Sequence, residues 1–122
     1  MYPTFHPLIR RWFADRCDGP TPAQAEGWSA IAAGKSTLIA APTGSGKTLA
    51  AFLWSIDGLV KRALAGALDE RTSVVYVSPL KALGNDIAKN LRAPLAEIYE
   101  LAGREGILLP TIRVAVRSAD TP

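Results

Sequence analysis

The sequence predicts an α/β fold with a parallel sheet, and three observations support that prediction. Short apolar segments bounded by turn residues alternate along the chain with longer segments in which apolar residues recur every three or four positions. A glycine-rich turn joins the first apolar segment directly to the helical pattern that follows it. The chain has 122 residues, 48% of them hydrophobic and 20% charged, which is ordinary for one globular domain. Strands that alternate with helices favour βαβ units with right-handed crossovers.

Composition excludes several other classes of protein. The apolar fraction is too high for a disordered polyelectrolyte, and Cys17 is the single cysteine, so a disulfide framework is excluded. The sequence has no apolar run of the roughly 18 residues that a membrane span needs. Its first residues lack the basic start and apolar core of a signal peptide. We therefore expect a cytoplasmic protein with no membrane partner, whose net charge of +3 permits an anionic ligand without requiring one.

Two helices are predicted before the first strand. The first spans 7–14 and has a proline at its first position, where a missing N–H costs nothing. The second spans 22–33, again with a proline at its start, and Gly34 is a suitable C-terminal stop. Thr21 and Gln24 have the spacing of a capping box at its N-terminus.

Three strands and two further helical segments follow in alternation. The strands are predicted at 37–41, 73–77 and 112–116, each a short apolar run suited to a buried parallel strand. The helix after the first strand should be amphipathic and about 17 residues long. Its apolar face consists of Leu49, Phe52, Leu53, Ile56, Leu59 and Val60. Between the second and third strands, helical spacing predicts a helix that Pro94 kinks or splits.

The most informative stretch is the turn Ala41-Pro-Thr-Gly-Ser-Gly-Lys47-Thr48. Its glycines let backbone N–H groups point toward a polyanion, and the helix that follows offers its positive N-terminal end. Lys47 adds a cation for the β- and γ-phosphates, and the Thr48 hydroxyl can hold Mg²⁺. The predicted nucleotide-binding residues of the turn are Thr43, Gly44, Ser45, Gly46, Lys47 and Thr48. The alternative is a glycine-rich turn that only reverses the chain, but the strand–turn–helix context favours an ATP or GTP site.

The same turn resembles the nucleotide-binding motif of the superfamily 2, DEAD/DEAH-box-like helicases, in which alanine commonly stands where the general pattern has its first glycine. Pro20-Thr-Pro-Ala-Gln24 with Gly27-Trp28 is similar to the Q motif of that family. Val77-Ser-Pro-Leu-Lys-Ala-Leu83-Gly-Asn-Asp86 is similar to its motif Ia. Together with the terminal Val-Arg-Ser-Ala-Asp-Thr-Pro122, these motifs resemble the large helicase-related, or Lhr-type, branch, which commonly has glycine where this chain has Ala119.

The resemblance implies a P-loop NTPase fold of the RecA-like type, a three-layer arrangement around a parallel sheet. Residues 1–122 would be the N-terminal part of the first RecA-like helicase domain, which makes this an incomplete domain. Within it, 1–35 would form the Q-motif helices and 36–122 the βαβαβ unit with the phosphate-binding turn.

The resemblance also implies roles for single residues. Gln24 would recognise the adenine edge, because an amide both donates and accepts; the alternative is that Gln24 only completes the capping box with Thr21. Pro79, Leu80 and Lys81 would line a groove for a nucleic-acid backbone, with Lys81 facing phosphates. A solvated lysine in the first turn of a helix is the alternative for Lys81. Arg117, with Ser118 to Thr121, matches a loop that approaches nucleic acid in relatives.

The tryptophans and phenylalanines lie at helical spacings, which favours packing in the core over stacking on bases. The residues concerned are Trp12, Phe13, Trp28 and Trp54. Phe5 or Phe13 could instead flank the adenine, and the sequence does not choose between them.

Residues for hydrolysis are not found in the sequence. Asp69-Glu70 precedes a predicted strand and therefore lies at the wrong end of the sheet, and Asp120 is followed by no second acid. We expect a segment that binds ATP and Mg²⁺ and contacts single-stranded DNA or RNA, with the missing C-terminal helicase domains as partners and no turnover on its own. In the complete enzyme Lys47 would contact the transferred phosphate in the transition state.

Two other functions remain open at this stage. One is a stand-alone nucleotide-binding or interaction module without helicase activity, and the other is an unrelated phosphate-loop kinase, for which acceptor-binding residues are not evident. A sheet limited to three strands would leave a hydrophobic edge and face uncovered, so we expect marginal stability for the isolated chain.

Overall fold

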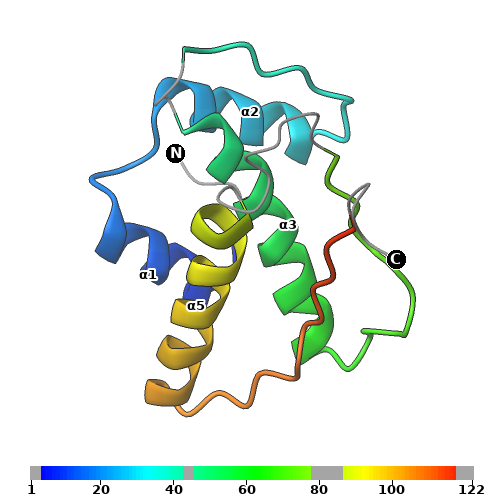
Figure 1. Ribbon diagram of the computed structural model, residues 1–122. Helices are drawn as coiled ribbons and strands as arrows, with labels where there is room; N and C mark the ends of the chain where they lie inside the picture. The colour runs from blue at the N-terminus through cyan, green and yellow to red at the C-terminus, as the bar shows by residue number, and fades with distance from the viewer. Residues whose placement is uncertain (1–3, 43–45, 78–86, 118–122) are drawn as a thin grey trace.

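The computed structural model describes residues 4–42, 46–77 and 87–117, and the regular elements within these ranges are helical (Figure 1). They are α1 (Pro7–Arg16), α2 (Pro22–Ala32), α3 (Lys47–Leu64), the π-helical turn η1 (Ala88–Arg92) and α5 (Ala93–Arg104). The predicted helices before and after the glycine-rich turn are therefore confirmed to within a few residues.

Side chains at the N-termini of α1 and α2 explain where these helices begin. The His6 Nδ1 atom accepts a hydrogen bond from the Leu8 N–H at 3.0 Å, ahead of the proline that opens α1. At the start of α2, Thr21 Oγ1 accepts from the Gln24 N–H at 3.2 Å, and Gln24 Oε1 accepts from the Thr21 N–H at 2.9 Å. The capping box predicted from the Thr21–Gln24 spacing is present.

The hydrophobic core surrounds α3, which runs through the middle of the molecule (Figure 1). Helix α2 packs against α3, and α1 packs against α5. The largest fully buried side chains are Trp28, Phe13, Ile9, Leu53, Ile56, Ile98 and Val60. In the described ranges, no helix is long and apolar enough to cross a membrane.

The predicted parallel sheet is not formed among the described residues, which corrects that part of the fold prediction. The segments 37–41, 73–77 and 112–116 run without strand pairing in this part of the chain. Val75 and Val77 are 75% and 83% exposed, so the second segment presents one apolar face with no cover. A strand needs neighbours for its N–H and C=O groups, whereas a helix satisfies these groups internally, so helices form here where strands do not.

Pro94 acts on the last helical region as the sequence predicts, and the structure shows how. The N–H of Ala93 bonds to the carbonyl of Ala88, five residues earlier, and so closes the π-helical turn η1 immediately before Pro94. A proline lacks the N–H of a regular helical turn, and its ring clashes with the carbonyl four residues before it. The wider turn relieves this clash, and α5 follows. Residues 78–86, where the same helix was predicted to begin, lie outside the described residues.

Candidate functional site

The start of α3 carries the described half of the predicted phosphate-binding turn. Thr43, Gly44 and Ser45 lie outside the described residues, whereas Gly46, Lys47 and Thr48 lie within them. Gly46 has φ +78°, a left-handed conformation that glycine adopts without strain, and α3 begins at the next residue. Gly46 has no side chain to cap the helix, and the N–H groups at a helix N-terminus suit an acceptor such as an anion.

The Lys47 side chain closes the turn by contacting the segment that precedes it. Its ammonium donates a hydrogen bond to the Ala41 carbonyl at 2.7 Å, and the side chain is exposed. This contact joins residues at the two ends of the predicted phosphate-binding turn. Thr48 is partly buried beside Lys47 in the first helical turn.

Gln24 is buried against the same helix terminus, with 3% of its surface exposed. Its amide nitrogen donates to the Gly46 carbonyl at 3.2 Å, while its amide oxygen is held by the Thr21 N–H. A Cβ atom on Gly46 would lie 2.3 Å from the Gln24 amide nitrogen, so a side chain at this position would displace the Gln24 amide. The capping role of Gln24 is therefore present in the structure, and its contact with an adenine stays a prediction.

The aromatic residues lie in the core, as their helical spacing predicts. The Phe5 and Phe13 rings both meet Trp28 edge to face, with ring centroids 5.1 and 5.6 Å apart. All three are buried, so neither phenylalanine presents a ring face to a base in this structure. Trp54 is partly buried, and its ring lies 6.1 Å from that of Phe5.

The predicted nucleic-acid contacts fall mostly outside the described residues. Pro79, Leu80 and Lys81 lie there, as do Ser118 to Thr121, whereas Arg117 is described and exposed.

The acidic pair Asp69-Glu70, which precedes a predicted strand, is described and lies on the surface. Asp69 and Glu70 are exposed and form ion pairs with Arg71 at 3.5 Å and Arg113 at 4.0 Å. Among the described residues, no group of three or more histidines, cysteines and acids is placed to hold a metal ion.

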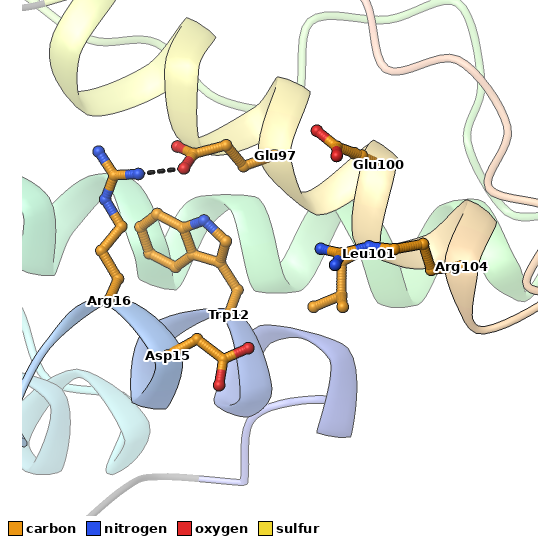
Figure 2. Close-up of a pocket in the computed structure, with 7 residues that line it drawn as sticks. All are labelled: Trp12, Asp15, Arg16, Glu97, Glu100, Leu101 and Arg104. Carbon is orange, nitrogen blue, oxygen red and sulfur yellow. Dashed lines mark hydrogen bonds and ion pairs between the residues drawn. The ribbon is translucent and has the colours of Figure 1, made fainter.

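Two cavities lie away from the phosphate-binding turn. One, of about 510 Å³, opens between α1 and α5, where Arg16 pairs with Glu97 and its guanidinium lies 5.6 Å from the Trp12 ring (Figure 2). The other, of about 880 Å³, lies along α3 beneath the extended segments. Neither is lined by Gln24 or Lys47.

Comparison with known proteins shows the family of this chain. The family model described as DEAD/DEAH box helicase matches residues 21–108, which is most of the chain. The chain belongs to the DEAD/DEAH box helicase family. The matched range includes α2, the phosphate-binding turn and α3.

Similar proteins confirm the Lhr-type branch predicted from the motifs. The chain is 55% identical over 118 residues to the Lhr helicase/probable uracil glycosylase of Mycolicibacterium smegmatis, covering 97% of this chain and 8% of that protein. It is 46% identical over 121 residues to the ATP-dependent helicase Lhr-Core of Methanocaldococcus jannaschii, covering 99% of this chain and 14% of that protein. The chain thus spans a small part of the length of these relatives.

A solved structure is similar to the described fold. The structure of Mycobacterium smegmatis helicase Lhr bound to ssDNA and AMP-PNP matches with a TM-score of 0.81 at 55% identity. The match covers 97% of this chain and 14% of that one. The described fold is therefore that of part of an Lhr helicase.

Proposed function

We propose that this chain is the ATP-binding segment of an Lhr-type, ATP-dependent nucleic-acid helicase. The observation that carries the proposal is the start of α3, where Lys47 and an uncapped first helical turn lie at the end of the glycine-rich turn. A cationic side chain beside the N–H groups of a helix N-terminus suits the phosphates of a nucleotide. The similarity to a helicase solved with AMP-PNP and ssDNA supports the same conclusion.

Binding of the triphosphate would change the partner of Lys47. In the structure its ammonium bonds to the neutral Ala41 carbonyl, and a phosphate oxygen is the stronger acceptor for a cation. The Thr48 hydroxyl fits Mg²⁺ as one oxygen ligand, since Mg²⁺ takes few protein ligands and completes its octahedron with phosphate oxygens and water. Gln24 would contact adenine once its amide nitrogen releases the Gly46 carbonyl.

The remaining parts of the proposal concern the complete helicase. Residues 1–35 would be its Q-motif helices, and 36–122 would form the start of a three-layer RecA-like sheet once further strands pair with the extended segments. Pro79, Leu80 and Lys81 would then contact single-stranded DNA or RNA. The catalytic acids would come from the remainder of this first RecA-like domain and the arginines from the second one, so this chain would bind ATP without turning it over.

Titration of the chain with a fluorescent ATP analogue and Mg²⁺ tests the proposal. Lys47→Ala should weaken binding by about 10-fold or more, since one charge-assisted hydrogen bond contributes about 1.5–3 kcal/mol. Lys35→Ala removes another exposed lysine, before the turn, and should leave the affinity unchanged. Equal affinities for the Lys47 variant and the unaltered chain would refute the assignment of the site, and nucleic-acid-stimulated hydrolysis by this chain would refute the absence of catalytic acids.

A further inference from the structure

One face of α2 contacts both flanks of the phosphate-binding turn. Gln24, Gly27 and Trp28 occupy positions i, i+3 and i+4 of that helix, so they lie on one face of it. All three residues are buried. Of the three, only Gln24 has a predicted role at the nucleotide, which leaves the other two without an assigned function.

Trp28 is attached to the first turn of α3. Its indole N–H donates a buried hydrogen bond to the Ala50 carbonyl at 2.9 Å, and Ala50 lies three residues after Lys47. The edge-to-face contacts with Phe5 and Phe13 fix the plane of the indole, so the N–H has a defined direction. Because the backbone N–H of Ala50 bonds to the Gly46 carbonyl at 3.0 Å, the contact reaches the residue where the turn enters the helix.

Gly27 brings the same face against the segment before the turn. A Cβ atom at Gly27 would lie 2.6 Å from Cδ1 of Ile39, a distance that real contacts do not show. The Ile39 side chain therefore packs into the space that a side chain at residue 27 would fill. One face of α2 thus contacts the segment before the turn at Gly27 and the helix after it through Gln24 and Trp28.

We propose that Trp28 is a positioning residue for the phosphate-binding turn. Its indole N–H fixes the first turn of α3 relative to the segment that precedes the phosphate-binding turn. The N–H groups of that helical turn and the Lys47 side chain, which would contact phosphate, are thereby held in place. The importance of this geometry for a nucleotide rests on the proposed function. The hydrogen bond from Trp28 to Ala50 is present without nucleotide, so it can be tested independently of nucleotide binding.

The chain offers a matched pair of variants to test this role. Trp28→Phe retains a buried aromatic ring and removes the donor to Ala50. Trp12→Phe makes the same change at another buried tryptophan, whose Nε1 has no hydrogen-bond partner in the described structure. Any general loss of stability from the smaller ring should therefore occur in both variants, whereas loosening of α3 should occur only in the first.

Hydrogen exchange at the backbone amides of residues 50–54, without nucleotide, is the deciding measurement. Trp28→Phe should accelerate exchange there roughly two- to tenfold more than Trp12→Phe does, the effect of losing one buried hydrogen bond. Binding of the ATP analogue should weaken in Trp28→Phe by a similar factor and stay unchanged in Trp12→Phe.

The outcomes separate this inference from the proposed function. Unchanged exchange in Trp28→Phe, or equal acceleration in both variants, would overturn the positioning role, as would accelerated exchange with unaltered nucleotide affinity. Failure of the unaltered chain to bind the analogue would contradict the proposed function, and the exchange measurement would still decide whether Trp28 holds α3.

Discussion

A buried carboxylate connects the N-terminal segment to the central helix. Asp57, on α3, is 4% exposed; its Oδ1 atom accepts from the His6 N–H at 2.7 Å, and its Oδ2 atom lies 2.9 Å from the Lys61 ammonium. Lys61 also donates to the Thr4 carbonyl. The sequence did not reveal this role, because one acid within an amphipathic helical pattern is ordinarily assigned to the solvent-facing side.

Replacing Asp57 should show how much that connection contributes to stability. Asp57→Ala leaves the His6 N–H without its acceptor and should lower the free energy of unfolding by about 1–3 kcal/mol in a denaturant titration. Asp57→Asn should cost less, because an amide oxygen still accepts from that N–H and only the ion pair is lost. Asp69→Ala, at an exposed acid, should stay within about 0.5 kcal/mol. Equal losses in the two Asp57 variants would show that the ion pair, and not the hydrogen bond, holds the segment.

At the scale of elements, Tyr99 on α5 holds the start of the last extended segment. Its hydroxyl donates to the Pro110 carbonyl and accepts from the Ile112 N–H at 2.7 Å. Burial raises the pKa of Tyr99, and the hydrogen bond from the Ile112 N–H opposes part of that rise. The neutral phenol is therefore favoured in the folded chain, and it alone can donate to Pro110.

This contact predicts an alkaline loss of stability. A pKa raised by folding contributes stability that is fully present below the ordinary tyrosine value of about 10 and is lost as pH rises through the folded-state pKa. The difference in unfolding free energy between the unaltered chain and Tyr99→Phe should therefore shrink above about pH 10. Burial also raises the pKa of Cys17, but the ionisation of Cys17 and of other groups contributes equally to both proteins and cancels in this comparison. A difference that is independent of pH would contradict the role of the neutral hydroxyl.

Helices were predicted from the sequence far better than strands, for a physical reason. Prolines, the Thr21–Gln24 capping box and apolar residues at helical spacing act within one element, and they place α1, α2 and α3. Strand pairing depends on residues remote in the sequence. The apolar runs 73–77 and 112–116 therefore identify segments able to pair, without showing that a partner is present.

The sequence likewise predicted only part of the candidate site. The pattern of the turn identified Lys47 and Gly46, which the structure places at the start of α3. It did not identify Trp28 or Gly27 as supports of the turn, because a tryptophan at helical spacing is ordinarily assigned to the core. The sequence did show that Gly27 and Trp28 lie three and four residues after Gln24 on one helix. That spacing indicates a supporting role only once Ile39 and Ala50 are known to contact this face of the helix.

At the scale of the whole molecule, the chain has a helical core with an extended apolar segment uncovered on one side. The Tyr76 ring lies 4.6 Å from that of Phe52 on α3, although Tyr76 is partly exposed. The neighbouring Val75 and Val77 are among the most exposed large hydrophobic residues of the described chain. An extended segment that is apolar on both faces, and whose edges are unpaired among the described residues, readily binds another strand, including one from a second copy.

The isolated chain should accordingly self-associate through residues 73–77. Its mean mass in sedimentation or light scattering should rise with concentration, and Val75→Lys combined with Val77→Lys should suppress the rise by placing charge on the uncovered face. Ser29→Lys combined with Ser36→Lys adds the same charge at two exposed serines outside this segment, without removing an apolar side chain, and should suppress association less. Equal suppression by both pairs would indicate that net charge controls association, and a chain that stays monomeric at all concentrations would show that Val75 and Val77 are no interaction surface.

Because covering these valines would also favour strand pairing, association should be accompanied by a gain of β-structure in the infrared amide I band. That gain should be absent from the Val75/Val77 variant.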